Sequence, residues 1–129
     1  MSNLLGAAEI REIAERIGVR PTKKLGQNFV IDANTCRKIV NVAGVESSDV
    51  ALEIGPGLGS LTLAILETGI PLVAVEIDER LAKQLPETVA AHQPNAKLTV
   101  INQDALSLTD LTISPSVLVA NLPYNVSVP

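Results

Sequence analysis

The sequence predicts an α/β fold with a parallel β-sheet, preceded by N-terminal helices. From residue 50 onward, short apolar runs alternate with segments of helical periodicity, and glycine, proline, asparagine or aspartate bounds most of the runs. Strands that alternate with helices in this way pair in parallel, because each helix returns the chain to the same edge of the sheet. The chain has 129 residues, of which 47% are hydrophobic, so one compact domain with a sizeable core is expected.

Two helices and a loop are predicted before the sheet begins. The helices are expected over 5–17 and 33–43, with a loop over 20–31. Apolar residues of the first helix recur at helical spacing, and Gly18 follows as a stop; they are Ala7, Ile10, Ala14 and Ile17. Asp32 is predicted to cap the second helix and Gly44 to end it. Its apolar face is predicted to hold Cys36, Ile39, Val40 and Ala43.

The second half of the chain is predicted to hold four strands and the helices between them. The strands are expected over 50–54, 72–76, 98–101 and 116–120. The helices are expected over 60–68, 79–91 and a short stretch within 105–113. Asp78 is predicted to cap the helix over 79–91, and Pro86 should kink or break it. This alternation predicts a Rossmann-like sheet, which usually needs further strands, so we expect the fold to be truncated after the fourth strand.

A glycine-rich loop joins the first strand to the following helix. Its glycines, Gly55, Gly57 and Gly59, allow a sharp turn and a close approach to a ligand. A dinucleotide loop has the spacing G-x-G-x-x-G, but here the third glycine comes one residue early. Glu53 at the strand end would repel a pyrophosphate and would suit the sulfonium and ammonium charges of S-adenosylmethionine. We therefore favour this methyl donor over a dinucleotide and over a purely structural turn.

Acidic residues follow the next two strands. Glu76 ends the second strand some twenty residues after the glycine loop, where a carboxylate can accept the ribose hydroxyls. Asp78 could compete for that role, but we interpret it as a helix cap. Asp104 follows the third strand and could accept a hydrogen bond from the adenine amino group, although aspartate is common in such loops.

The segment after the fourth strand, Asn121-Leu122-Pro123-Tyr124, is predicted to be catalytic. An aromatic amine is a poor nucleophile because its lone pair is delocalised into the ring. The Asn121 side-chain oxygen and the Leu122 carbonyl could accept its two N–H bonds and aim the lone pair at the donor methyl. Pro123 would stiffen the loop, and Tyr124 would offer a face on which the base stacks. The alternative is an ordinary turn, since Asn and Pro are common there.

Charge and composition restrict the remaining possibilities. The net charge is -4, but residues up to Lys38 include seven basic and four acidic side chains, a local net charge of +3. This segment could contact RNA phosphates or be an ordinary solvated surface. No apolar run is long enough to span a membrane, and no signal peptide is evident, so we expect a cytoplasmic location. No metal site is expected, because His92 and Cys36 are single residues without a cluster.

The motifs and their order resemble those of the ribosomal RNA adenine dimethyltransferases, most nearly the bacterial small-subunit branch. The matching segments are 24–30 (KLGQNFV), 53–59 (EIGPGLG), 75–78 (VEID), 103–105 (QDA) and 121–125 (NLPYN). The resemblance implies a class I methyltransferase fold. It also implies that Asn28, Val30 (through its backbone), Gly55, Glu76, Asp104 and Asn121 line the S-adenosylmethionine site.

The resemblance implies dimethylation at N6 of two adjacent adenines near the 3′ end of small-subunit ribosomal RNA, with the immature small subunit as partner. Residues 1–45 would form a helical extension and 46–129 the first part of the cofactor domain. The family's remaining strands and helical C-terminal domain would be absent. The isolated chain is therefore expected to be inactive and to self-associate. Alternatives are a non-catalytic module that binds the methyl donor or RNA, a large-subunit RNA methylase and, least favoured, a nicotinamide-dependent oxidoreductase.

Overall fold

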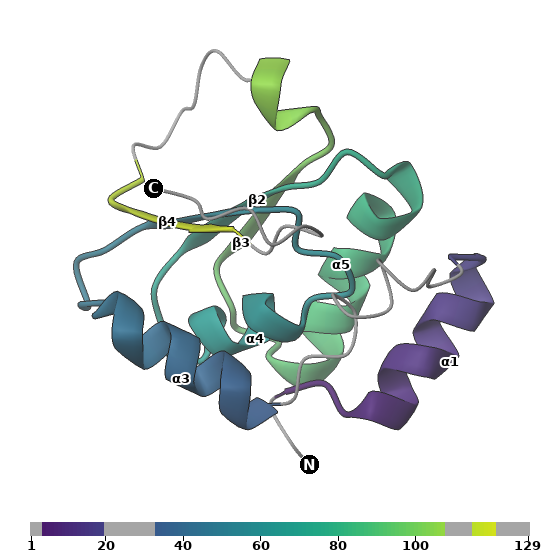
Figure 1. The fold of residues 1–129 in the computed structure, drawn as a ribbon, viewed down its shortest axis with the longest axis horizontal. Helices are drawn as coiled ribbons and strands as arrows, with labels where there is room; N and C mark the ends of the chain where they lie inside the picture. Colours follow the sequence, from purple (N-terminus) through teal and green to yellow (C-terminus); the bar gives the residue numbers. More distant parts are fainter. Residues whose placement is uncertain (1–3, 20–32, 108–114, 121–129) are drawn as a thin grey trace.

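The structure, a computed structural model, describes residues 4–19, 33–107 and 115–120 of the chain. It confirms the predicted α/β architecture (Figure 1). The helices are α1 (Ala7–Ile17), α3 (Ala33–Ala43), α4 (Ser60–Leu66) and α5 (Glu79–His92), with a 3₁₀ turn, η1, over Ala105–Ser107. The strands are β1 (Ala51–Ile54), β2 (Leu72–Val75), β3 (Leu98–Ile101) and β4 (Val117–Ala120).

The four strands form one parallel sheet in the order β3-β2-β1-β4. This order reverses direction at β1, as it does in one half of a Rossmann-like fold. The last residue of β1, Ile54, pairs with Val75 of β2 on one side and with Ala120 of β4 on the other. Because the strands are parallel, the carboxyl ends of all four strands lie at the same edge of the sheet.

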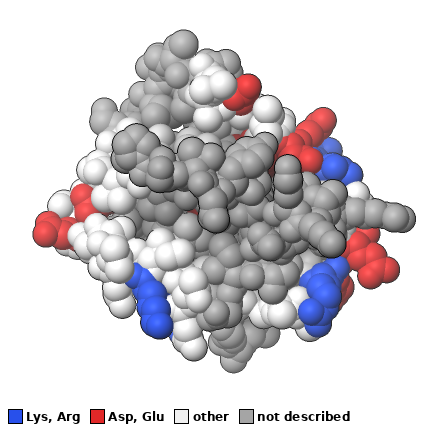
Figure 2. All heavy atoms as spheres, viewed as in Figure 1, with Lys and Arg blue, Asp and Glu red and all other residues white. Residues whose placement is uncertain are grey.

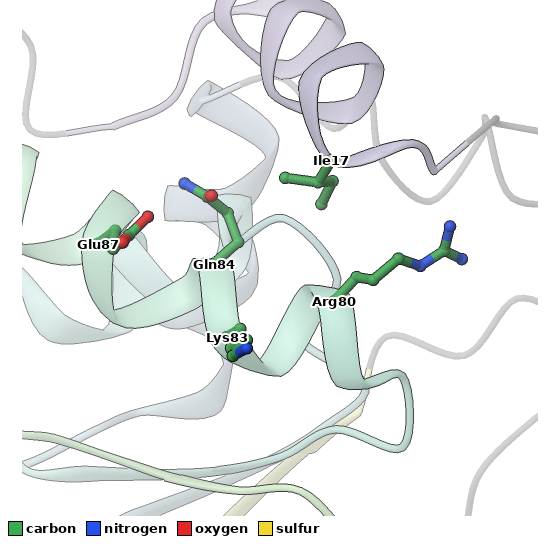
Figure 3. Close-up of a pocket in the computed structure, with 5 residues that line it drawn as sticks. All are labelled: Ile17, Arg80, Lys83, Gln84 and Glu87. Atoms are coloured by element: carbon green, nitrogen blue, oxygen red, sulfur yellow. The ribbon is translucent and has the colours of Figure 1, made fainter.

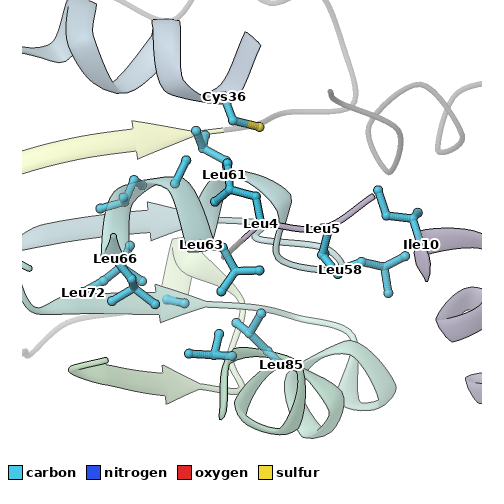
Figure 4. Packing of buried hydrophobic residues seen from close by; sticks show 14 of the residues in the cluster. Leu4, Leu5, Ile10, Cys36, Leu58, Leu61, Leu63, Leu66, Leu72 and Leu85 are labelled. Carbon is cyan, nitrogen blue, oxygen red and sulfur yellow. The ribbon is translucent and has the colours of Figure 1, made fainter. Parts of the chain in front are cut away.

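The core lies between the sheet and the helices, with α3, α4 and α5 on the same side of the sheet in Figure 1. Every residue of α4 is buried, since this short helix lies between β2 and α3. Leu63 of α4, Leu72 of β2 and Leu85 of α5 meet in this layer (Figure 4). Burial of one such leucine contributes roughly 1.5–3 kcal/mol, so this layer dominates the stability of the sheet.

The two N-terminal helices pack onto this layer, but not entirely through the predicted residues. In α1 the buried residues are Ile10, Ile13 and Ala14, whereas Ala7 in the first turn is exposed. In α3, Cys36 and Val40 are buried as predicted, but Ile39 and Ala43 are exposed. The main neighbour of α1 is α5 and that of α3 is α4. In each helix, the buried face therefore holds fewer of the predicted residues than the sequence pattern indicated.

The helix that Pro86 was predicted to kink or break is not broken at that residue. The helix α5 runs without interruption from Glu79 to His92, and Asp78 caps it as predicted, with its side chain accepting from the backbone N–H groups of Arg80 and Leu81. Pro86 is exposed on α5. A proline has no N–H to donate, so the carbonyl of Ala82, one turn earlier, loses its helical hydrogen bond while the helix continues. The predicted cap Asp32 lies outside the described residues.

Candidate functional site

The glycine loop between β1 and α4 has the backbone conformation that its sequence predicted. Gly55, Gly57 and Gly59 have φ values of 70°, 60° and 104°, a region that side-chain-bearing residues rarely adopt. The Gly55 N–H donates to the carbonyl of Val75 at 2.9 Å, which ties the start of the loop to the end of β2. The loop therefore turns sharply at the sheet edge, with its backbone close to the residues that follow β2.

Glu76, the predicted ribose ligand, lies directly after β2 and is 5% exposed. One of its carboxylate oxygens accepts from the Gly57 N–H at 3.1 Å, and the other accepts from the Asp78 N–H at 3.0 Å. Burial raises the pKa of Glu76, while these backbone donors oppose the shift. Glu76 thus joins the glycine loop to the start of α5, and each of its oxygens retains a lone pair for a further donor.

Glu53 is fully buried in β1 on the face that packs against the helices. Residues alternate between the two faces of a strand, so Glu53 shares the face of Ala51, a core residue. Its Oε1 accepts from the hydroxyl of Thr62 in α4 at 2.5 Å, whereas Oε2 has no hydrogen-bond partner among the described residues. Burial raises the pKa of Glu53 to about 7, with a smaller upward contribution from the negative charge of Glu76.

The end of β3 contributes two polar residues to the same edge. Asp104, the predicted adenine ligand, is exposed and accepts from the Leu106 N–H at 3.0 Å, so it caps η1. Asn102 donates from Nδ2 to the carbonyls of Glu76 and Ile77, at 2.8 and 3.2 Å. The sequence reasoning missed Asn102 and Thr62. The signal for Asn102 is an asparagine placed directly after a strand, at the edge where a loop needs a donor.

The structure brings together Glu53, Gly55, Gly57 and Glu76, and places Asp104 after the neighbouring strand. The predicted ligands Asn28 and Val30 lie outside the described residues. So does the predicted catalytic segment of Asn121, Leu122, Pro123 and Tyr124. Strand β4 ends at Ala120, which pairs with Ile54. Asn121 therefore follows directly in the chain from the edge that holds the glycine loop.

An open groove of about 420 Å³ lies between α1 and α5 (Figure 3). Its lining includes Ile17 of α1 and Arg80 and Lys83 of α5. Arg80 donates to the carbonyl of Gly18 at 2.8 Å and pairs with Asp78 at 3.3 Å, so it fastens the end of α1 to α5. The lining carries both positive and negative side chains, and the groove is open to solvent. Of the predicted cofactor ligands that the structure describes, none lines it. We therefore assign this groove to helix packing.

Other polar residues in the described regions have structural partners. His92, for which no metal role was predicted, lies 2.8 Å from Glu9 of α1. Arg37 forms a two-point ion pair with Glu67, at 2.9 and 3.3 Å. Within residues 4–19, 33–107 and 115–120, no group of three His, Cys, Asp or Glu side chains could hold a metal ion. None of the helices in those ranges is long and apolar enough to cross a membrane.

In the view of Figure 2 the blue side chains are divided among separate places near the margin, and on the right they lie beside red ones, so this view of the described surface shows no single basic patch. Of the seven basic residues that gave the N-terminal segment its charge of +3, Arg20, Lys23 and Lys24 lie outside the described residues. Arg11 and Arg16 are exposed on α1. The two interpretations of this segment, RNA contact and a solvated surface, both remain predictions.

The geometry, a glycine loop and two buried carboxylates at one edge of a parallel sheet, can be compared with known proteins. The family model described as ribosomal RNA adenine dimethylase matches residues 19–129. The chain belongs to the ribosomal RNA adenine dimethylase family. This confirms the resemblance drawn from the motifs.

Curated relatives in this family share most of this sequence. The chain is 66% identical over 128 residues to ribosomal RNA small subunit methyltransferase A of Leifsonia xyli subsp. xyli (strain CTCB07), a match that covers 98% of the chain and 46% of the relative. It is 61% identical over 130 residues to the protein of the same name from Nocardia farcinica (strain IFM 10152), with 98% and 44% covered. The chain therefore spans less than half the length of these relatives.

Solved structures agree with the fold. A dimethyladenosine transferase from Plasmodium falciparum is 30% identical with a TM-score of 0.58, covering 74% of this chain and 34% of that one. The 23S rRNA methyltransferase ErmE is 31% identical with a TM-score of 0.62, covering 74% and 38%. The glycopeptide N-methyltransferase MtfA, at 22% identity and a TM-score of 0.58, shares the fold alone. The sheet described above is thus the front part of a Rossmann-like class I methyltransferase fold.

Proposed function

We propose that this chain binds S-adenosylmethionine at the edge where β1, β2 and β3 end. We further propose that the whole protein uses it to dimethylate N6 of two adjacent adenines near the 3′ end of small-subunit ribosomal RNA. The observation that carries the proposal is the pair of buried carboxylates, Glu53 and Glu76, on either side of a glycine loop. A carboxylate at Glu53 repels the pyrophosphate of a dinucleotide and suits the positive charges of S-adenosylmethionine, and a carboxylate at Glu76 suits its ribose.

The residues at this edge fit the cofactor. The Oε2 atom of Glu53 is buried without a partner among the described residues, and a cationic ligand would supply one. Glu76 is fixed by two backbone N–H groups, and the free lone pairs of its carboxylate can accept from the two ribose hydroxyls. Gly55 and Gly57 keep side chains out of the loop, so a ligand can approach its backbone. The cofactor, when bound, supplies an electrophilic methyl group.

The remaining predicted residues complete the proposed site. Asp104 would accept from the adenine amino group of the cofactor through a lone pair that the Leu106 N–H leaves free. Asn28 and Val30 would contact the cofactor from the N-terminal segment. Asn121 and Leu122 would accept the two N–H bonds of the target amine and aim its lone pair at the methyl group.

Pro123 would stiffen the catalytic segment, and the ring of Tyr124 would stack on the target base. Positioning and electrostatics are sufficient for this transfer, and no covalent enzyme intermediate is required. The side-chain oxygen of Asn121 and the main-chain carbonyl of Leu122 would have to lie within hydrogen-bonding distance of the same amine.

The relatives' names support small-subunit ribosomal RNA as substrate. The immature small subunit as partner and the cytoplasm as location belong to the same proposal. The solved 23S rRNA methyltransferase keeps a large-subunit substrate as the second candidate. The division into an N-terminal extension (1–45) and a cofactor domain (46–129) is part of the same proposal. Its support is that the glycine loop and both carboxylates lie in the second part. We also propose that the isolated chain binds cofactor without turnover.

Calorimetric titration of the chain with S-adenosylmethionine and with NAD tests the cofactor. We expect binding of the first only, and loss of that binding in Glu76→Gln, which keeps the shape of the side chain but loses its charge. Glu67→Gln, a substitution of a carboxylate in the surface ion pair with Arg37, is the matched control and should bind as the unaltered chain does. Binding of NAD without S-adenosylmethionine would overturn the proposal.

The substrate is tested separately with the whole protein. Methyl transfer to immature small ribosomal subunits is compared with transfer to free large-subunit RNA, and dimethyladenosine is the measured product. We expect product on the small subunits only. Transfer to the large-subunit RNA alone would replace the proposed substrate with that of the second candidate, while leaving the cofactor site unaffected.

A further inference from the structure

Thr62 and Glu53 form a buried pair at the base of the glycine loop. Both residues are 0% exposed, and the Thr62 hydroxyl donates to Glu53 Oε1 at 2.5 Å. Apart from Thr62 and the N-terminal Ser60, the helix α4 consists of leucine, isoleucine and alanine. A valine at position 62 would have almost the shape of threonine without its hydroxyl. The hydroxyl is therefore a specific feature of this position that core packing does not require.

The electrostatic setting of Glu53 disfavours a negative charge. Among the described residues, the charged group that faces it is Glu76 at the end of β2, which raises its pKa further. The neighbouring strand β2 is apolar, the sequence of β4 is apolar, and α4 has no charged residue. The Thr62 hydroxyl opposes this effect, because a donor to a carboxylate stabilises the ionised form.

We propose that Thr62 is a positioning residue for the cofactor: its hydroxyl favours the ionised form of Glu53 and turns the carboxylate so that Oε2 faces the positive charge on the methionine part of S-adenosylmethionine. This inference rests on the proposed function. Thr62 occupies one oxygen, and the other is buried and without a partner among the described residues. A buried, unpaired charge is costly, so the arrangement favours a ligand that carries the opposite charge.

The proposal distinguishes two ligands that share their adenosine part. S-adenosylmethionine carries a sulfonium and an ammonium, whereas 5′-methylthioadenosine carries neither. Ionised Glu53 should favour the first and be nearly indifferent to the second. Because burial raises the pKa of Glu53 to about 7, where the carboxyl is half ionised, the ratio of the two affinities should increase with pH throughout the range below about pH 7.5. The titration should stay below about pH 7.5, since the ligand's own amino group loses its proton near pH 8.

The test compares Thr62→Val with Thr62→Ser in the 129-residue chain by calorimetry with both ligands. Thr62→Val should weaken binding of S-adenosylmethionine about tenfold, which is the size of effect expected for a hydrogen bond to a charged group. It should also move the rise in the affinity ratio to higher pH. Binding of 5′-methylthioadenosine should change less than about twofold. Thr62→Ser should restore both the affinity and the pH profile. Thr88→Val is the control, since Thr88 is 3% exposed in α5 and its hydroxyl accepts from Gln84.

The outcomes separate this inference from the proposed function. If the unaltered chain binds no S-adenosylmethionine at any pH, both fail together. If it binds but the affinity ratio is independent of pH, or if Thr62→Val weakens both ligands equally, only the role of Thr62 is overturned. Should Thr62→Val fail to fold by circular dichroism, the pH dependence of the affinity ratio in the unaltered chain and in Thr62→Ser decides: a rise toward pH 7 supports the inference, and a flat profile overturns it.

Discussion

Replacement of Gly59 by alanine should destabilise the fold more than any other glycine-to-alanine change for which the surroundings are described. Gly59 precedes α4 with φ at 104° and ψ at 15°, and a Cβ atom built there would lie 2.8 Å from Leu85 Cδ1. Leu85 is 1% exposed and belongs to the central core layer. Two separate effects therefore add at this position: backbone strain and a steric overlap with α5.

The structure offers glycines that separate these effects. Gly69 has φ at 94°, but its added Cβ would meet nothing within 4 Å, so Gly69→Ala reports backbone strain alone, roughly 1–2 kcal/mol. At Gly6 the backbone is extended and the space is open, so Gly6→Ala should lie within about 0.5 kcal/mol of the unaltered chain. Gly59→Ala adds overpacking of roughly 1–2 kcal/mol, because the end of the Leu85 side chain can shift only partly. Its total cost is about 2–4 kcal/mol.

Urea unfolding followed by far-ultraviolet circular dichroism measures the three variants, since the chain contains no tryptophan. The double variant Gly59→Ala/Leu85→Ala should cost about 1 kcal/mol less than the sum of its two single changes, because the smaller side chain relieves the overlap. The proposed contact with Leu85 is wrong if Gly59→Ala lowers the free energy of unfolding no more than Gly69→Ala does. It is also wrong if the effects of Gly59→Ala and Leu85→Ala on that free energy are additive.

Three further changes follow from the structure. Between about pH 4.5 and pH 7 the free energy of unfolding should fall by about 3 kcal/mol, because Glu53, with its pKa raised to about 7, keeps in the folded state a proton that the unfolded chain releases. Urea titrations of Glu53→Gln should lose this slope, and an unchanged slope would contradict the assignment. Pro86→Ala should raise the melting temperature, gaining about 1–3 kcal/mol by restoring an N–H donor to the Ala82 carbonyl; a lower melting temperature would show that the proline is accommodated without cost. Leu118 on β4 is 59% exposed, so Leu118→Lys should reduce self-association as measured by light scattering. Equal association of the variant and the unaltered chain would exclude this surface as the site of self-association.

The order and type of the elements could be predicted from sequence, because apolar periodicity and punctuation by glycine and aspartate are local signals. Strand β3 has the predicted bounds, and the other strands differ by one residue at an end. The predictions that failed depend on tertiary contacts. Whether Ala7 or Ile13 is buried in α1 depends on how the helix lies on α5, and whether Pro86 breaks its helix depends on which side of α5 faces water.

The candidate site divides in the same way. The sequence by itself determined the glycine loop, the carboxylates Glu53 and Glu76 and the family to which the chain belongs, because these depend on residue type and on spacing along the chain. Only the tertiary structure decided what surrounds the carboxylates: that Glu76 is fixed by Gly57 and Asp78, and that Glu53 has one oxygen bonded to Thr62 and the other without a partner among the described residues. Burial and hydrogen bonding between distant segments set the charge state of a carboxyl group, and neither can be read from its neighbours in sequence.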